Sequence, residues 1–349
     1  MFAVSCSHSS APPASPDHPD SLPRVSPPPA ELVTAQASSQ EPVPPPRLSP
    51  SSRAATPAKP AERAERRVAF QYELKGRHFP LPLVRGTIAG TPTWMLVDTG
   101  ANSHVVAGWL ARQVGLPLKK LGELGSDHAG RTITTFRVDH PQMAIDDWGA
   151  VADGPMLATE VPPFIEELGI GGFVSPQRLV EGEGGAVVLD FVGGEMRASR
   201  YSGAVERLGH HGTSIAPKGG RVCEDDASPI QGLAFVIPAS VEGRSVDLLV
   251  DTGAQRSDLL VTSGVGRALA PRSVANKETL YAASGRMTSR TVRRATVSVG
   301  GYAVRTDVDL IPGAADPYCP RDGVVSMDVL RSCVLVLGKT SMTGRCGAR

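Results

Sequence analysis

Apolar and polar positions alternate in short runs along most of the chain, and these runs occur in two similar sets. In the first set, two apolar runs flank a turn at Gly90, and the second run ends at Val97. In the second set, the turn lies at Gly243 and the following run ends at Val250. Short apolar runs bounded by turn residues predict buried strands, and glycine supplies the positive φ that a tight hairpin needs. Each set therefore predicts a strand, a hairpin turn and a second strand.

The same four residues follow both hairpins. They are Asp98-Thr99-Gly100-Ala101 and Asp251-Thr252-Gly253-Ala254, and each Asp comes eight residues after its turn glycine. A third landmark, residues 169–172 in one set and 323–326 in the other, begins 71 and 72 residues after the Asp. Three landmarks at matching intervals indicate an internal duplication rather than a chance motif.

The duplication divides the chain into two pseudo-symmetric lobes. We predict lobes at residues 67–207 and 227–349, joined by a connector at 208–226. High glycine and proline contents, 37 and 31 residues, favour short strands and many turns over long helices. The fold class predicted is thus mostly β and bilobal, with short helices. One such helix is expected at 108–114, and another after Ser175 as N-cap and Pro176 as the first helical residue.

Residues 1–66 differ in composition from the rest. Residues 11–60 hold 15 of the 31 prolines, and no aromatic residue occurs between Ala3 and Ala69. Such a segment buries too little apolar surface to offset its ordering entropy, so we predict a disordered tail or tether. Both a plain spacer, which we favour, and a proline-rich docking segment fit this composition.

Cys6 follows small residues and precedes the proline-rich tail. This arrangement resembles the end of a bacterial lipoprotein signal, in which such a cysteine becomes lipid-modified and tethers the protein to a membrane. The charged and long apolar parts of a signal are missing, so this interpretation expects a start codon further upstream. The alternative is a cysteine without function in a disordered tail.

Four further cysteines lie in the second half: Cys223, Cys319, Cys333 and Cys346. An even set fits two disulfides with three connectivities, of which we favour Cys223–Cys346 with Cys319–Cys333. Disulfides predict a place outside the reducing cytosol, in the cell envelope or secreted. Four buried free thiols remain the alternative.

Charge and motifs exclude several functions. A formal net charge of +1 argues against a nucleic-acid-binding protein, which normally shows a basic face. Phosphate-binding Gly-Lys loops, dinucleotide fingerprints and Gly-x-Ser-x-Gly elbows are absent from the sequence. The His210-His211 pair in the connector is expected to be solvated, so we predict neither a metal nor an organic cofactor.

The repeated tetrapeptide suits hydrolysis by an activated water. Two close carboxylates, Asp98 and Asp251, share one proton because both cannot easily ionise. One then takes a proton from water while the other donates to the substrate carbonyl. Thr99 and Thr252 offer hydroxyls that hydrogen-bond across the pseudo-two-fold axis, and the glycines allow backbone N–H groups to reach the carboxylates.

Over residues 67–349 the chain resembles the retropepsin/pepsin clan of aspartic peptidases, especially bacterial single-chain members with tandem retropepsin-like repeats. The resemblance implies a cleft between two lobes, with Asp98 and Asp251 as catalytic residues. It implies support of the active-site loops by Thr99, Gly100, Ala101, Thr252, Gly253 and Ala254. It places flaps near Gly130 and Gly285, where Tyr281 fits either a flap contact or a packed aromatic.

The sequence also departs from the family pattern. Ser326 stands where glycine is usual, and Gly171 where a larger apolar residue is usual. Ala101 and Ala254 lack the hydroxyl that pepsins carry there, which predicts a less acidic pH optimum. The function predicted is a monomeric aspartic endopeptidase acting on extended peptide or protein substrates, and the alternative is a non-catalytic peptide-binding module of the same fold.

Overall fold

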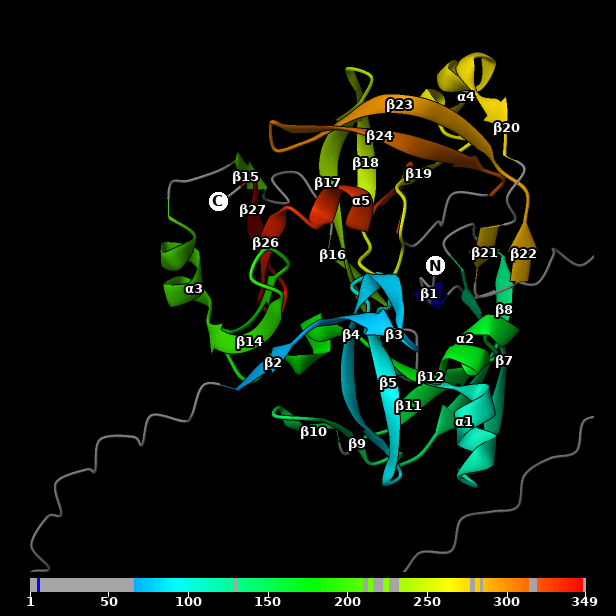
Figure 1. The fold of residues 1–349 in the computed structure, drawn as a ribbon, viewed down its shortest axis with the longest axis vertical. Coiled ribbons are helices and arrows are strands. Elements are labelled where there is room, and N and C mark those ends of the chain that lie inside the picture. Colours follow the sequence, from blue (N-terminus) through cyan, green and yellow to red (C-terminus); the bar gives the residue numbers. More distant parts are fainter. Residues whose placement is uncertain are drawn as a thin grey trace, which may run out of the picture. The chain divides into compact units, whose positions relative to one another are not determined.

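Strands dominate the structure. The computed structural model describes residues 5–6, 66–127, 131–152, 154–209, 213–215, 222–225, 232–276, 280–282, 285–313 and 319–347. These residues form two β-rich lobes with short helices only, so the predicted fold class is confirmed (Figure 1). The predicted tail lies outside the described residues except for Cys6, whose backbone is part of a two-residue strand.

The first lobe is built on an 11-stranded sheet. In sheet order its strands are β1 (Ser5–Cys6), β7 (Lys119–Ser126), β8 (Thr132–Val138), β11 (Met156–Thr159), β6 (Val105–Ala107), β12 (Ile170–Val174), β5 (Thr91–Val97), β4 (Arg77–Ile88), β9 (Met143–Ile145) and β10 (Gly149–Ala152), with β3 (Gln71–Leu74) beside β4. Strand β12 lies between β5, to which it is parallel, and β6, to which it is antiparallel.

The second lobe repeats this pattern. Its eight-stranded sheet runs β16 (Val222–Asp225), β17 (Gly232–Val241), β18 (Arg244–Val250), β25 (Gly323–Val325), β19 (Asp258–Leu260), β24 (Tyr302–Ile311), β23 (Arg290–Val299) and β20 (Val274–Ala275). Strand β25 is parallel to β18 and antiparallel to β19, as β12 is to β5 and β6. A separate hairpin consists of β21 (Leu280–Ala282) and β22 (Gly285–Met287). The duplication seen in the sequence is therefore a duplication of topology.

A third sheet joins the lobes. Its six strands are β15 (Thr213–Ile215), β27 (Met342–Cys346), β26 (Cys333–Leu337), β13 (Gly185–Asp190), β14 (Glu195–Arg200) and β2 (Arg67–Ala69). The central pairing of β13 with β26 places Val187 opposite Leu337, both fully buried. One apolar cluster accordingly extends through both lobes, so a chain boundary near residue 207 is not a boundary of the core.

The helical elements are short. They are α1 (Gly108–Gln113), α2 (Pro163–Leu168), the 3₁₀ turn η1 (Pro176–Leu179), α3 (Tyr201–Leu208), α4 (Gly264–Leu269), the 3₁₀ turn η2 (Ala270–Arg272) and α5 (Met327–Leu330). The helix predicted at 108–114 is present, but the segment after Ser175 forms only a 3₁₀ turn, without a cap hydrogen bond from the Ser175 side chain. Among the described residues, none of the helices combines the length and the apolarity needed to cross a membrane.

Both predicted hairpin turns have the same geometry. Ala89 and Gly90 have φ of 50° and 76°, and Glu242 and Gly243 have φ of 52° and 76°. Two consecutive residues with positive φ form the turn that matches the twist of a two-residue hairpin. These turns set the register of β4 with β5 and of β17 with β18, and so the position at which each strand delivers its Asp.

The third landmark repeats with a different register from the one predicted. Phe173 pairs with Val105 and Val324 pairs with Asp258, and Val105 and Asp258 each come seven residues after their Asp. Phe173 is therefore equivalent to Val324, so matching residues 169–172 with 323–326 was wrong. The cause is an irregularity in β12 between Ile170 and Gly172, which has no counterpart recorded in β25.

The disulfide pairing also differs from the favoured one. Cys333 and Cys346 form a disulfide between β26 and β27, where they lie directly opposite each other. This excludes both Cys319–Cys333 and Cys223–Cys346, because the strand register rather than the ends of the lobe brings the partners together. Cys319 is also disulfide-bonded, to a partner outside the described side chains, and the side chain of Cys223 is outside them too.

Candidate active site

Each repeated tetrapeptide begins where a buried strand ends. Asp98 follows β5 and its N–H donates to the carbonyl oxygen of Val174, at 2.8 Å. Asp251 follows β18 and its N–H donates to Val325 O, at 3.0 Å. The last residues of β12 and β25 thus hold the two loops in equivalent positions, one in each lobe.

The two carboxylates lie close to the backbone of the opposite loop. A Cβ added at Gly100 would lie 2.6 Å from Cγ of Asp251, and one at Gly253 would lie 2.4 Å from Cγ of Asp98. Real Cβ atoms do not approach this closely, so only glycine fits at either position. Neither glycine has a positive φ, so close approach across the lobes, rather than turn conformation, requires them.

Backbone N–H groups hold one oxygen of each carboxylate. Gly100 N and Ala101 N donate to Asp98 Oδ1 at 2.8 and 3.0 Å. Gly253 N donates to Asp251 Oδ1 at 2.8 Å. The Oδ2 atoms of both residues are buried and accept no hydrogen bond from the described part of the chain. Each carboxylate therefore has one oxygen fixed by its loop and one available for a shared proton or a substrate.

The threonines interlock between the lobes as the sequence predicted. Thr99 Oγ1 donates to Val250 O at 2.7 Å and accepts from Thr252 N at 3.1 Å. In the opposite direction, Thr252 Oγ1 donates to Val97 O at 2.7 Å and accepts from Thr99 N at 3.0 Å. All four groups are buried, so the network fixes the two loops against each other.

Burial dominates the electrostatics of the pair. Both carboxylates are fully buried, which raises the pKa of Asp98 well above its usual range and also raises the pKa of Asp251. The charge of Asp251 raises the pKa of Asp98 further, while the N–H donors partly oppose these effects. Two carboxyls that cannot both ionise readily hold a proton between them over a broad pH range.

The geometry can be set beside known proteins. A sequence profile described as aspartyl protease matches residues 84–188 and 237–329. The chain belongs to the aspartyl protease family. The two matched segments contain the two tetrapeptides, in agreement with the predicted tandem repeats, so each lobe carries one copy of the family's domain. Among curated proteins, none matches this sequence.

Serine replaces the usual glycine of the aspartyl protease pattern in both lobes. The corrected register makes Ser175 the counterpart of Ser326, so the departure noted for the second lobe is shared by the first. Both side chains are fully buried. Ser175 N donates to Nδ1 of His104 at 3.1 Å, and Ser326 N donates to Oγ of Ser257 at 3.0 Å. The symmetric bonding shows that serine is accommodated in the same way in both halves.

Two buried residues that the sequence did not single out stabilise the loops. Gln177 Nε2 donates to Thr99 O, Ala101 O and Leu233 O at 3.1, 2.9 and 2.7 Å, and so ties the first loop to the second lobe. In the second lobe, Asp328 accepts hydrogen bonds from both N and Oγ of Ser257. Each residue comes two positions after the equivalent serine, and alignment of the repeats in the correct register would have found them.

The two halves of this family domain differ in charge. Asp258 stands where the first lobe has Val105, and it is opposite Asp309 in the pairing of β19 with β24. Burial, followed by the charges of Asp251 and Asp309, raises the pKa of Asp258. Arg321, which is buried, acts in the opposite direction on Asp251 and Asp258. The site is symmetric in backbone but not in electrostatics.

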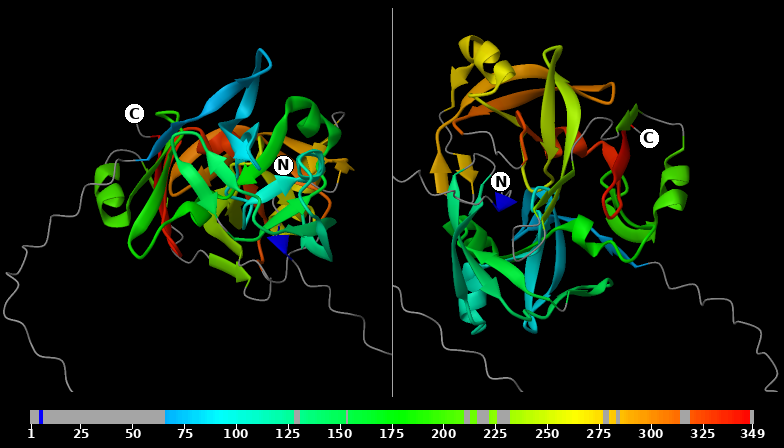
Figure 2. Two further views of the ribbon diagram at one scale, coloured as in Figure 1. Left: turned by 90° about the horizontal axis from the view of Figure 1, so that it is seen from below. Right: turned by 180° about the vertical axis from the view of Figure 1, so that it is seen from behind.

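A contact between hairpins covers the predicted flap region. Strands β7 and β8 form one hairpin and β21 and β22 the other, and the two lie close together (Figures 1 and 2). Arg131 Nη1 donates to Arg286 O at 3.1 Å, and Nη2 to Gly285 O at 3.5 Å. Asp127, fully buried, accepts from Arg131 N and pairs with its Nε. Arg131 thus links the two hairpins, one from each lobe.

The remaining predicted site residues are only partly described. Gly130 lies outside the described residues, and Tyr281 lies in β21 with its side chain outside them. Cys6 is paired through its backbone with Gly125 of β7, and its lipidation stays a prediction. Among the described residues, no group of three or more His, Cys, Asp or Glu side chains lies close enough to hold a metal ion.

Proposed function

We propose that this aspartyl protease family member is an endopeptidase that hydrolyses peptide bonds at an Asp98/Asp251 dyad. One observation carries the proposal: two buried carboxylates from opposite lobes lie at each other's loops, each with an unbonded Oδ2. A pair that shares a proton supplies a base and an acid at once.

The reaction follows from that pairing. The ionised carboxylate takes a proton from water as the water oxygen bonds to the peptide carbonyl carbon. The protonated carboxyl gives its proton to the carbonyl oxygen, so a neutral tetrahedral diol forms. The diol then returns a hydroxyl proton to the dyad while the C–N bond breaks, and the leaving nitrogen takes a proton. Burial strengthens these transfers because water does not screen them.

The hairpins of the flap region support an extended substrate. The carbonyl contacts of Arg131 hold β7–β8 and β21–β22 together above a cleft that an extended peptide would enter. Peptides in this conformation present backbone N–H and C=O groups to neighbouring strands. We therefore propose peptides or unfolded protein segments as substrates, and no nucleic acid.

The alternative is a peptide-binding module that does not cut. It was suggested by Ser326, but the same substitution in the first lobe and the intact dyad both favour catalysis. Incubation with a mixed peptide library and mapping of termini separates the two functions. New N-termini with the wild type, absent with Asp98→Asn, are the result expected. Tight binding without new termini would contradict hydrolysis and support the binding module.

We also propose that the protein acts as a monomer outside the reducing cytosol. The Cys333–Cys346 disulfide supports the location, because such bonds persist in oxidising compartments. Two lobes in one chain support the monomer, because one chain supplies both carboxylates. Light scattering and thiol counting on protein from its native compartment test these two points. A stable dimer would contradict the first, and four free thiols outside Cys6 the second.

A further inference from the structure

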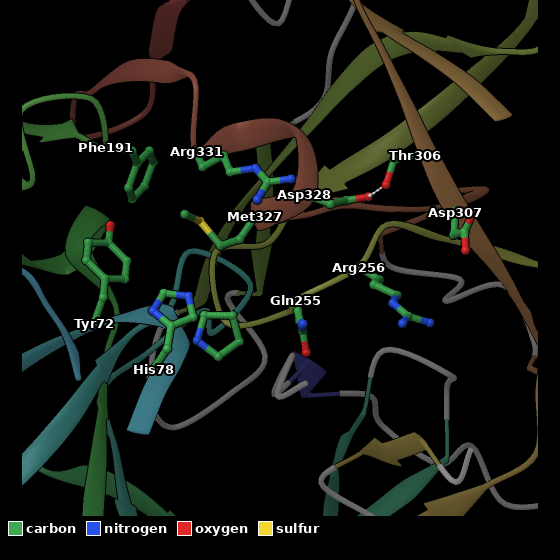
Figure 3. A pocket seen from close by; sticks show the side chains of 11 residues that line it. Tyr72, His78, Phe191, Gln255, Arg256, Thr306, Asp307, Met327, Asp328 and Arg331 are labelled. Carbon is green, nitrogen blue, oxygen red and sulfur yellow. Dashed lines mark hydrogen bonds between the residues drawn. The ribbon is translucent and has the colours of Figure 1, made fainter. Parts of the chain in front are cut away.

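A pocket of about 420 Å³ lies where the two lobes meet, beside the second catalytic loop. It is lined by residues of both lobes: Tyr72, His78, Pro80, Phe191, Gln255, Arg256, Thr306, Asp307, Met327, Asp328 and Arg331 (Figure 3). Neither Asp98 nor Asp251 is among them, so the pocket is separate from the dyad.

The pocket nevertheless lies within reach of a bound peptide. Met327 N donates to Ala254 O at 3.2 Å, and Asp328 N donates to Gln255 O at 3.1 Å, so α5 rests on the catalytic loop. Gln255 comes four residues after Asp251, which limits the distance between their Cα atoms to about 15 Å. An extended peptide advances about 3.3 Å per residue, so a residue three to five positions from the scissile bond can reach the pocket.

One wall of the pocket is aromatic and well supported. Phe191 and Met327 are 6% and 3% exposed. Phe70 stacks on Phe191 with ring centroids 5.6 Å apart and contacts Tyr72 edge to face at 6.3 Å. Burial raises the pKa of Tyr72 to about 12, so its hydroxyl remains a hydrogen-bond donor at physiological pH. This wall offers packing for the apolar part of a side chain and one neutral donor.

The carboxylates of the pocket are already engaged within the protein. Asp328 accepts from both N and Oγ of Ser257 and from Thr306 Oγ1, the last at 2.8 Å. Asp307 accepts from Arg294 N at 2.8 Å. Their oxygens therefore have little capacity left for a ligand donor.

The cations are less engaged. Arg331 and His78 are exposed, and neither side chain has an ion-pair partner within the described part of the chain. Figure 3 shows them on opposite sides of Met327, with Tyr72 and Phe191 nearby. Arg256 adds a third cation toward the other end, 4.0 Å from Asp309. The pocket thus presents donors and positive charge above an apolar floor.

We propose that this pocket binds the acidic side chain of an extended peptide substrate, with the carboxylate between Arg331 and His78. The methylene groups of a glutamate would pack on Met327 and Tyr72. An arginine–carboxylate hydrogen bond in a partly desolvated pocket is among the stronger polar contacts available to a protein. This inference rests on the proposed function for its peptide ligand, and it specifies a sequence preference for that ligand.

Binding to the full-length Asp98→Asn variant tests the pocket apart from hydrolysis. Fluorescent peptides with amidated C-termini would carry Glu, Gln or Lys at one position, three to five residues from a defined central bond. Amidation removes the terminal carboxylate, so only a side chain can supply the anion. We expect the Glu peptide to bind about tenfold tighter than the Gln peptide at one of these positions.

Two further variants identify the residue responsible. Arg331→Gln in the Asp98→Asn background should reduce the preference for Glu to within about twofold. Arg293→Gln, which removes the same charge from an exposed site on β23 away from the pocket, should leave it unchanged. Equal binding of Glu and Gln peptides, a preference that survives Arg331→Gln, or no binding of any peptide would each overturn the proposal. Peptides bound with this preference but never cleaved by the wild type would support the pocket while contradicting the endopeptidase.

Discussion

Thr99 and Thr252 each donate a hydroxyl proton into the opposite lobe and accept the other's backbone N–H. The four bonds measure between 2.7 and 3.1 Å, and both side chains are completely buried. Each threonine is directly followed by the glycine that contacts the opposite carboxylate. The distance between the two carboxylates is therefore set by a hydrogen-bonded network and not by a flexible hinge.

Removal of one hydroxyl should damage this network. Thr99→Val keeps the shape of the side chain but leaves Val250 O and Thr252 N without their partner. Each unsatisfied buried group costs about 1–3 kcal/mol, so we expect unfolding to become easier by about 2–4 kcal/mol. Urea denaturation measures this change, with Thr99→Ser as the control that retains the hydroxyl. A valine variant as stable as the serine variant would contradict the role of the network.

The buried dyad should cost stability at neutral pH. The pKa of Asp98 is raised in the folded state, so the fold binds its proton more tightly than the unfolded chain does. The resulting stabilisation is complete below the unfolded pKa and is lost as the pH rises through the folded pKa. Asp98→Asn removes this loss while its amide oxygen can still accept from Gly100 and Ala101. We expect its Tm at pH 7 to exceed that of the wild type by a few degrees.

The pH dependence and a control make this test specific. The difference in Tm should disappear near pH 3, where the wild-type carboxyls are protonated in both states. Asp147→Asn is the same substitution at an exposed position and should show no such dependence. A thermal unfolding series from pH 3 to 8 checks both expectations. A variant less stable than the wild type at pH 7 would show that Asp98 is not held at an electrostatic cost.

The activity profile should follow the same shift. Hydrolysis needs one protonated and one ionised carboxyl, and burial raises the pKa of both Asp98 and Asp251. The active pH range is therefore displaced upward, and the absence of a hydroxyl at Ala101 and Ala254 acts in the same direction. We expect kcat/KM to peak above about pH 4. A peak well below pH 4 would contradict this reading of the electrostatics.

Arg131 should control the movement of the flap hairpins. Arg131→Gln loses the forked contact with the carbonyl oxygens of Gly285 and Arg286, so β8 and β22 should exchange their amide hydrogens faster. We expect kcat/KM to fall about tenfold because the cleft closes less completely. Arg137→Gln alters the same hairpin through its pair with Asp139 and serves as the control. Unchanged exchange in the Arg131 variant would show that the contact does not restrain the flaps.

The sequence was informative where the pattern repeats locally. The turns at Gly90 and Gly243, the strands that end at Val97 and Val250, and the short helix at Gly108 all depend on neighbouring residues, and all were predictable. The two tetrapeptides were recognisable because polar residues directly follow buried strands. Their glycines, however, are required by a contact with the opposite lobe, which no local pattern reveals.

The errors arose where a distant segment decides. The strand irregularity before Gly172 shifts the third landmark, and spacing counted from Asp98 does not detect it. The disulfide between Cys333 and Cys346 follows from the register of two neighbouring strands. Gln177 and Arg131 act on backbone atoms of the other lobe, and backbone acceptors leave no signature in the sequence. Long-range pairing therefore limited the prediction more than local propensity did.

The most direct test of the account is hydrolysis by three proteins: the wild type, Asp98→Asn and Asp251→Asn. Each variant removes one carboxylate from the pair and keeps the shape of its loop, which circular dichroism and Tm would verify. We expect the wild type to cleave a peptide substrate and kcat/KM to fall by about 10³-fold or more in each variant. Substantial cleavage by either variant would contradict a dyad in which both carboxylates are needed.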